Sequence, residues 1–442
     1  MTRLFGTDGV RGVANADLTP ELALRLGRAA GHVLGGAGHS VIIGRDTRRS
    51  GRMLESALAA GLCSVGIDVR LAGHIPTPGL AYLTSSEGFV AGAVISASHN
   101  PAPDNGIKFF DDRGLKLPDA LEDRIEAAMR DDAALPRPTE RGIGLIGDVR
   151  GLVRKYEDFL VAHAPPLAGV RVVLDCANGA TYRVAPTVFA RAGAEVLTLF
   201  DTPDGENINL GCGSTQPAAL QRAVRDHGAD VGFAFDGDGD RVITIDGAGA
   251  AHDGDFVLAL VARHFGRAGK LDPPVVVGTV MTNGGLEATL ARDGISLLRT
   301  QVGDRYVWEG LERSGAQFGG EPSGHVIFRE HASTGDGIFT ALEVLHLARA
   351  EGRSVVDLAA EIESWPQVTK NVHAARRGEW REVGRFSEAV RDAEVRLGGT
   401  GRLVVRASGT EPVLRITVEA RDDALAQRIA EELATTAAEA LA

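Results

Sequence analysis

The chain has 442 residues, more than a single hydrophobic core usually supports, so we expect two to four domains. Hydrophobic residues make up 44% and charged residues 24%, as in an ordinary globular protein, which excludes a largely disordered chain. A formal net charge of -12 argues against a nucleic-acid partner, because phosphate backbones bind basic surfaces; it does not exclude a small phosphorylated substrate.

The N-terminus and the cysteines favour a cytoplasmic protein. Residues 1–12 are polar and glycine-rich and lack the apolar centre of a signal peptide. No run of about 20 apolar residues is present, so we expect no membrane partner. Cys63, Cys176 and Cys212 are odd in number and form no C-x-x-C pair, which favours reduced thiols over disulfides or a zinc site.

A unit of apolar strand, polar turn, helix and second short strand occurs three times. Its first strands are predicted at residues 41–44, 172–175 and 275–278, and its second strands at 66–69, 193–196 and 294–297. Continuous apolar strands that alternate with helices are typical of mostly parallel sheets covered on both faces. Three spaced copies therefore predict three related three-layer α/β domains.

The C-terminal part of the chain lacks this repeat. From about Trp365 onward we expect a strand, a helix over residues 382–397, strands over 403–406 and 413–418, and a long alanine-rich helix. This order predicts a smaller α+β domain. The predicted boundaries are 1–150 for domain I, 151–250 for domain II, 251–365 for domain III and 366–442 for domain IV.

A polar turn that contains a serine follows a strongly apolar run in the first predicted domain. Ser98 lies in the turn Ser96–Pro101, directly after the run Phe89–Ile95. In open α/β sheets ligands bind at that end of the strands, so the turn is expected to direct the Ser98 hydroxyl into a cleft. His99 and Lys108 lie near it in sequence and can supply protons or positive charge. An ordinary polar turn is the alternative, and no G-x-S-x-G elbow indicates a hydrolase.

Three aspartates follow a second apolar run. Asp236, Asp238 and Asp240 alternate with glycines after the predicted strand Val231–Phe235. Like charges about 5 Å apart repel by roughly 3 kcal/mol per pair at an effective dielectric of 20, so converging carboxylates need a cation. Oxygen ligands alone suit Mg²⁺ or Ca²⁺ rather than Zn²⁺. Gly247 stands where an EF-hand needs glutamate, and a solvated acidic turn is the alternative.

A third segment combines Glu321, Ser323 and His325 in a glycine-flanked loop. A carboxylate, a hydroxyl and an imidazole together can bind sugar hydroxyls or an amine. A plain hairpin turn would also explain the segment.

The fourth segment is typical of an anion-binding turn. A predicted strand ends at Arg406, and Ser408, Gly409 and Thr410 follow. Turn N–H groups, hydroxyls and a guanidinium suit a phosphate, although a simple β-turn is the alternative. A serine, a hard-metal site, a polyhydroxyl-binding loop and a phosphate-binding loop indicate a phosphosugar phosphotransferase. No nucleotide-binding loop is visible, so the simplest phosphoryl donor is the enzyme itself.

These four segments, in this order, resemble the α-D-phosphohexomutase family, and the match extends to the opening Gly6–Gly12. The resemblance implies four domains around a central cleft and a phosphorylated Ser98. It implies Mg²⁺ bound by the aspartates and the phosphoserine, and three groups of contacts. The transferring phosphoryl would be surrounded by Arg11, His99, Lys108 and Arg241, and the sugar would be bound by Glu321, Ser323 and His325. The other phosphate would be bound by Arg406, Ser408, Gly409 and Thr410. The implied metal ligands are Ser98, Asp236, Asp238 and Asp240.

The implied reaction moves a phosphoryl group between O6 and O1 of a hexose through a 1,6-bisphosphate, which also serves as primer. Lys108 or His99 would do the acid–base work; as a base, Lys108 needs a pKa well below about 10.4, which a cationic neighbourhood favours. The resemblance also implies a homodimer.

Three segments look like the branch of the family that converts glucosamine 6-phosphate to glucosamine 1-phosphate, for UDP-N-acetylglucosamine and cell-wall synthesis. They are Leu4–Gly12, Gln301–Val307 and Thr334–Ile338. Pro322 departs from this branch, which usually has glutamine there, and from the mannose and glucose branches, which usually have methionine.

Three other interpretations stay open. A phosphomannomutase or phosphoglucomutase would have the same catalytic residues. An aspartate-nucleophile phosphatase expects D-x-D-x-[TV], whereas Asp240 and Arg241 stand at the end of this run. A non-catalytic sugar-phosphate sensor would need neither Ser98 nor the aspartates.

Overall fold

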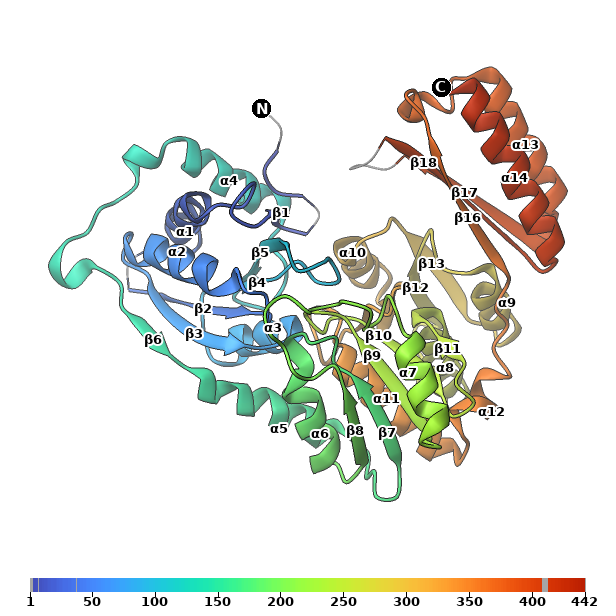
Figure 1. Ribbon diagram of the computed structural model, residues 1–442, viewed down its shortest axis with the longest axis horizontal. Helices are drawn as coiled ribbons and strands as arrows, with labels where there is room; N and C mark the ends of the chain where they lie inside the picture. The colour runs from blue at the N-terminus through green and yellow to red at the C-terminus, as the bar shows by residue number, and fades with distance from the viewer. Residues whose placement is uncertain (1–2, 7, 37, 408–411, 442) are drawn as a thin grey trace.

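The computed structural model describes residues 3–6, 8–36, 38–407 and 412–441. Its strands form four sheets, one after another along the chain. Figure 1 shows them in an arc, with the first and the fourth sheets at its two ends. The predicted phosphate-binding residues Ser408, Gly409 and Thr410 lie outside the described residues.

The first sheet has the strand order β1-β5-β4-β2-β3-β6. Val41 and Ile43 of β2 pack into one core with α1, α2 and α4, whereas Ile42 packs into another with α3. Successive residues of the strand are therefore both buried, which is why it is apolar throughout. The elements are β1 Val10–Val13, α1 Pro20–Leu34, β2 Ser40–Arg45, α2 Gly51–Cys63, β3 Asp68–His74, α3 Thr77–Ser86, β4 Ala91–Ile95, β5 Asp104–Asp111, α4 Asp119–Arg130 and β6 Ile146–Asp148.

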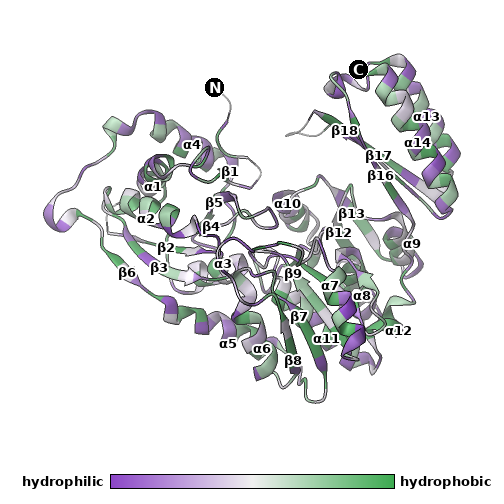
Figure 2. Cartoon of the chain, in the orientation of Figure 1, coloured by the Kyte–Doolittle hydropathy of each residue, from purple (hydrophilic) through white to green (hydrophobic). Residues whose placement is uncertain are grey.

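The second sheet has the order β11-β10-β9-β7-β8 and is also covered on both faces. Val173 packs with α7 on one side, and Val172 and Leu174 pack into a large core on the other. Figure 2 shows β7 and β8 mostly in green, and purple on the outer helix α7. The elements are α5 Val153–His163, β7 Arg171–Asp175, α6 Val184–Arg191, β8 Glu195–Leu199, α7 Ala218–Asp226, β9 Val231–Phe235, β10 Val242–Asp246 and β11 Ala251–His252.

The third sheet has the order β13-β12-β14-β15. Its strands contribute to the large core of the second domain, and α11 is buried over most of its length between the two domains. Domains II and III are therefore joined by continuous apolar packing. The elements are α8 Gly254–Arg267, β12 Val275–Thr279, α9 Gly284–Arg292, β13 Ser296–Thr300, α10 Asp304–Ser314, β14 Phe318–Gly320, β15 Val326–Phe328, α11 Gly337–Glu351 and α12 Val355–Ala359.

The fourth sheet is antiparallel, with the order β16-β18-β17, and has its own core. Its elements are β16 Gln367–His373, α13 Gly384–Leu397, β17 Gly401–Ala407, β18 Val413–Ala420 and α14 Asp423–Ala440. Short 3₁₀ helices lie at Asp132–Ala134, Glu140–Gly142, Arg150–Leu152, Ala180–Tyr182, Arg377–Glu379 and Gly398–Thr400. The predicted class, three related α/β domains and a smaller α+β domain, is confirmed. The predicted boundaries stay predictions, and β11 completes the second sheet just beyond residue 250.

The three α/β domains share a longer unit than the sequence repeat predicted. Each has three neighbouring parallel strands, β3-β2-β4, β8-β7-β9 and β13-β12-β14, and then an antiparallel strand, β5, β10 or β15. The expectation of mostly parallel sheets missed these antiparallel strands, because apolar pattern does not encode strand direction. The loops with Ser98, the aspartates and Glu321 each connect a third parallel strand to its antiparallel partner, so both ends of each loop are held in a sheet.

The structure bears on two expectations from the sequence, which concern the cysteines and membrane-spanning helices. Cys63, Cys176 and Cys212 are buried, unbonded thiols. Among the described residues, no helix combines the length and the hydropathy that a membrane crossing needs.

Phe386 is fully buried in the core of domain IV, which shares no residue with the other cores of the described chain. We predict that Phe386→Ala lowers the local free energy of unfolding by about 3–5 kcal/mol. Hydrogen exchange followed by mass spectrometry should then show faster exchange in β16–β18, α13 and α14. Phe233→Ala, in the large core of domains II and III, is the matched control and should spare domain IV. Loss of protection in β2 and β4 of the Phe386 variant would contradict the prediction.

Candidate active site

The loops of the first three domains meet at one place. Ser98 Oγ of domain I donates a hydrogen bond to Asp236 Oδ2 of domain II. His325 Nδ1 of domain III lies 3.6 Å from Asp240 Oδ2. Segments that are far apart in the sequence therefore form one cluster, and the predicted serine and aspartates share it.

Ser98 is held in an unusual main-chain conformation. Its φ is 52°, in the left-handed region, which costs a non-glycine residue roughly 1–3 kcal/mol. Its N–H donates to Ser96 Oγ at 3.0 Å, and the residue is 1% exposed. A Cβ on Gly237 would lie 2.5 Å from Ser98 O, so the two loops approach as closely as only glycine permits. This conformation directs the hydroxyl toward the aspartates.

The three aspartates form a buried carboxylate cluster. One oxygen from each of Asp236, Asp238 and Asp240 lies within 4.8 Å of the others. Burial and the charges of Asp240 and Asp238 raise the pKa of Asp236 well above its usual value. Asp238 Oδ1 and Asp240 Oδ1 are buried without a hydrogen-bond partner in the described structure. Unpaired oxygens of this kind fit a hard divalent cation, so the residues suit Mg²⁺.

Lys108 is buried against the same carboxylates. Its Nζ lies 3.2 Å from Asp238 Oδ2 and 3.9 Å from Asp240 Oδ2. Burial alone lowers the pKa of Lys108, but the charges of Asp238, Asp240 and Asp8 outweigh it and keep this pKa above its usual value. The expectation that neighbouring cations lower the pKa of Lys108 is therefore wrong for the described structure. Carboxylates lie beside the amine and keep it protonated.

His99 and two arginines form the cationic side of the cluster. Arg241 Nη1 lies 3.1 Å from His99 Nδ1. Burial and the charges of Arg241 and Arg11 lower the pKa of His99 to about 4. The imidazole is therefore neutral near pH 7, and Nδ1 accepts from the guanidinium, so its hydrogen belongs on Nε2. Arg11 Nε and Arg241 Nε are buried without a hydrogen-bond partner in the described structure, although Arg241 Nε lies 3.7 Å from Asp240 Oδ1. Buried guanidinium groups of this kind suit an anion.

The loop of domain III is a tight turn with an available hydroxyl. Gly324 N donates to Glu321 O at 3.0 Å, so Pro322 is the second residue of a four-residue turn, where its fixed φ is favourable. Pro322 thus leaves the turn intact. Glu321 Oε1 accepts from Gly303 N at 2.9 Å, and Ser323 Oγ is buried without a hydrogen-bond partner in the described part of the chain.

His325 lies deeper than its two neighbours in this loop. Its side chain is 3% exposed, and Nε2 accepts a hydrogen bond from Gly335 N at 3.0 Å. The other ring nitrogen faces Asp240. Both nitrogens therefore contact protein groups, and the ring is placed to orient the aspartate. A sugar contact by His325 stays a prediction.

Arg406, the described residue of domain IV that is predicted to bind phosphate, is half-buried on β17 opposite Arg415 of β18, and its phosphate contact stays a prediction. Burial and the charge of Arg415 lower the pKa of Arg406 from its usual value, whereas the charge of Glu321 opposes this shift. Domain IV is docked on domain III, where Gly284 N donates to Glu419 Oε2 at 2.9 Å.

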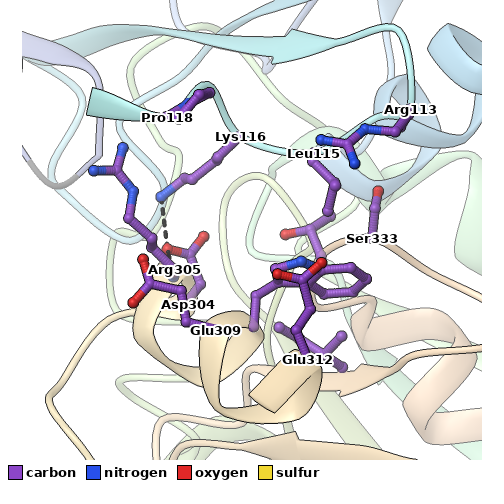
Figure 3. A pocket seen from close by; sticks show the side chains of 12 residues that line it. Arg113, Leu115, Lys116, Pro118, Asp304, Arg305, Glu309, Glu312 and Ser333 are labelled. Atoms are coloured by element: carbon purple, nitrogen blue, oxygen red, sulfur yellow. Dashed lines mark hydrogen bonds and ion pairs between the residues drawn. The ribbon is translucent and has the colours of Figure 1, made fainter. Parts of the chain in front are cut away.

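A cavity of about 190 Å³ marks the contact between domains I and III. Figure 3 shows Lys116 reaching toward Asp304, and Lys116 Nζ lies 2.8 Å from Asp304 Oδ1 and 2.6 Å from Asp8 Oδ1. Arg305 Nη2 donates to Leu117 O at 2.8 Å. The cavity is not lined by Ser98, Asp236, Asp238 or Asp240. Its residues instead connect domain I, which carries Ser98, with the segment after β13. That segment contacts Glu321 through Gly303.

Two residues outside the predicted site hold the Ser98 turn. Arg48 is 1% exposed and donates to Ser98 O at 2.9 Å. Asn209 of domain II donates to the same oxygen at 2.8 Å. The polar run Arg45–Arg48 after an apolar strand was an available signal for the first. Nothing in the sequence near Asn209 indicates its contact, which depends on the docking of two domains.

Comparison with known proteins gives matches over nearly the whole chain. Models for phosphoglucomutase/phosphomannomutase match in four parts: alpha/beta/alpha domain I at residues 2–135, domain II at 154–249, domain III at 253–365 and the C-terminal domain at 368–436. A phosphoglucosamine mutase from Desulforamulus reducens is 53% identical over 438 residues, covering 98% of this chain and 99% of the relative. One from Thermus thermophilus is 52% identical over 437 residues, covering 98% and 97%.

Solved structures have the same fold. A phosphoglucomutase/phosphomannomutase family protein from Burkholderia thailandensis is 26% identical with a TM-score of 0.82, covering 99% of this chain and 97% of that one. The N-acetylphosphoglucosamine mutase of Aspergillus fumigatus, solved with GlcNAc-6P and magnesium, is 18% identical with a TM-score of 0.71, covering 99% and 96%.

We predict that Asp238→Ala removes tight Mg²⁺ binding, because it deletes one of three convergent carboxylates and its unpaired Oδ1. Loss of an outer contact to a metal ligand costs about 10–100-fold in affinity, so loss of a ligand should cost at least about 100-fold. Titration calorimetry or native mass spectrometry measures the change. Asp112→Ala, on an exposed loop, is the matched control. Undiminished Mg²⁺ binding by the Asp238 variant would remove the metal assignment.

Proposed function

Because the chain belongs to the phosphoglucomutase/phosphomannomutase family, we propose that it interconverts glucosamine 6-phosphate and glucosamine 1-phosphate through a phosphorylated Ser98. Relatives of about this chain's full length, at 53% and 52% identity, are named phosphoglucosamine mutases. The observation that carries the proposal is the hydrogen bond between Ser98 Oγ and Asp236, which brings a nucleophilic hydroxyl to a cation site lined by arginines.

In the first half-reaction, O1 of glucosamine 6-phosphate attacks the phosphorus of phosphoserine 98. The bond from phosphorus to O1 forms, and the bond from phosphorus to Oγ breaks. The O1 proton leaves, and Oγ takes up a proton. The products are the free hydroxyl of Ser98 and glucosamine 1,6-bisphosphate.

In the second half-reaction, the bisphosphate has turned over within the site and presents its O6 phosphate. Ser98 Oγ attacks that phosphorus and loses its proton, and O6 leaves and becomes protonated. The enzyme regains its phosphoserine, and glucosamine 1-phosphate is released. A trace of hexose 1,6-bisphosphate serves as primer, because it can phosphorylate any Ser98 that has lost its phosphate.

The charge of the phosphoryl group in transfer is met by the chain's own cations. The Nε–H groups of Arg11 and Arg241, which donate no hydrogen bond to any described residue, and the Nε2 hydrogen of His99 suit its outer oxygens. Lys108, which keeps its proton, is suited to protonate a leaving oxygen and to recover the proton in the reverse step. Mg²⁺ held by Asp236, Asp238, Asp240 and the phosphoserine would neutralise charge on the same group.

Domains III and IV would bind the sugar and its second phosphate. Ser323 has a free hydroxyl and Glu321 a carboxylate, which suits the ring hydroxyls and the ammonium group of glucosamine. Arg406 and the loop with Ser408, Gly409 and Thr410 would bind the phosphate that is not reacting. The product is a precursor for UDP-N-acetylglucosamine and the cell wall, in the cytoplasm. A homodimer, suggested by the resemblance, stays a prediction.

Ser98→Ala should lower turnover by at least about 10⁴-fold, because it removes the group that carries the phosphoryl. A coupled assay of glucosamine 1-phosphate formation measures this, and intact mass spectrometry should show that the added mass of one phosphate is lost as well. Ser56→Ala, an exposed serine of α2, is the control and should keep both. Near-normal turnover by the Ser98 variant would disprove the phosphoserine mechanism.

A panel of hexose 6-phosphates tests the sugar, with a trace of hexose 1,6-bisphosphate as primer. We expect kcat/KM for glucosamine 6-phosphate to exceed that for glucose or mannose 6-phosphate by about tenfold or more, because Glu321 can pair with the amine. The Ser98→Ala enzyme provides the blank. A preference for mannose or glucose 6-phosphate would instead support a phosphomannomutase or phosphoglucomutase, the alternative that Pro322 keeps open.

A further inference from the structure

We propose that Arg48 and Asn209 act as a two-sided clamp on the main chain of Ser98, and that this clamp positions the phosphoryl group for transfer. Both are positioning residues, since they contact the turn and not the reacting atoms. The inference rests on the proposed function, because it assumes that Ser98 carries the phosphoryl.

Arg48 holds Ser98 from within domain I, on both sides of the residue. Its Nη2 donates to Ser98 O at 2.9 Å and to Asn100 O at 2.8 Å. Its Nε donates to Asp46 Oδ2 at 2.9 Å, and that carboxylate accepts from Ser96 Oγ at 2.6 Å. Ser96 Oγ in turn accepts from Ser98 N at 3.0 Å. One guanidinium therefore fixes the carbonyl of Ser98 directly and its N–H through two side chains.

Asn209 holds the same turn from domain II. It lies in the long connection between β8 and α7 and is 7% exposed. Its Nδ2 donates to Ser98 O at 2.8 Å and to Asn100 O at 3.0 Å. Ser98 O thus accepts one hydrogen bond from each domain, which fills both of its lone pairs. Because Asn209 is in the domain of the aspartates, this contact sets the separation between Ser98 and Asp236.

The main chain of Ser98 needs such support for a physical reason. Its left-handed conformation is unfavourable for serine and persists only where the surroundings impose it. The hydroxyl is attached two bonds from the main chain, so a rotation of this backbone moves the phosphoryl away from the line of attack. A displacement of about 1 Å can lower a rate about 100-fold. The clamp therefore supplies geometry for transfer and adds no contact to the sugar.

The test uses the full-length enzyme and four substitutions. Asn209→Leu and Asn209→Asp keep the size of the side chain and remove both N–H donors. Arg48→Lys keeps the charge but offers no planar fork for several carbonyl oxygens. Arg49→Met is the matched control. Arg49 is next to Arg48 in the chain, but its side chain is 81% exposed and pairs only with exposed Glu206 in the described structure. The probe is a hexose 1,6-bisphosphate, and rapid quench with intact mass spectrometry follows its transfer to dephosphorylated Ser98.

We expect the Asn209 and Arg48 variants to transfer the phosphoryl about 10- to 100-fold more slowly than wild type. Asn209 has a φ of 58°, so the Asn209 variants should also unfold at a lower temperature. At a temperature where they are folded, KM for the sugar phosphate should stay near wild type while the transfer rate falls, a separation that a merely structural role would not give. Arg49→Met should match wild type throughout. Wild-type transfer rates in both Asn209 variants would overturn the clamp. If wild-type Ser98 itself accepts no phosphoryl, the proposed function fails first, and the two failures are distinct.

Discussion

The hydrogen bond between Ser98 and Asp236 is the contact on which the rest of this structure depends. It joins a hydroxyl of domain I to a carboxylate of domain II, in a place where three buried carboxylates repel one another. Such a cluster is stable only with protons, cations or ammonium groups beside it. Lys108 and Arg241 partly meet this need, and one oxygen each of Asp238 and Asp240 has no hydrogen bond in the described structure, which suits a metal ion. The electrostatic demand of the cluster and the chemistry of phosphoryl transfer therefore coincide.

The repeated domain explains how so many separate loops reach one point. In each of the first three domains the functional loop follows the third parallel strand and turns into an antiparallel fourth. A hairpin connection holds both loop ends, so side chains on it are placed more accurately than on a free loop. The equivalent loops of the three domains carry different side chains: a serine, three carboxylates and a polar turn. Function has diverged at one position of a common scaffold.

The loops are also linked by contacts that do not touch a substrate. Gly303 N donates to Glu321, and the neighbouring Asp304 pairs with Lys116 of domain I, so the loop of Glu321 and the domain of Ser98 share one interface. His325 faces Asp240, which links the loop of Glu321 to the loop of the three aspartates. Domain IV, by contrast, has a core of its own and docks on domain III through a few polar contacts such as Gly284 with Glu419. This arrangement suits a domain that admits the sugar and then covers it.

The sequence by itself determined the local chemistry: the apolar strands, the class of each domain, Ser98 at a strand end and three alternating aspartates after another, which predict a hard-cation site. These follow from periodicity and side-chain type, which are properties of neighbouring residues. Only the tertiary structure decided which groups meet. It revealed the antiparallel fourth strands, the carboxylates that face Lys108, the inward ring of His325 and the contact of Asn209 with Ser98. Strand direction, burial and distance across domains depend on the whole fold, and no local pattern encodes them.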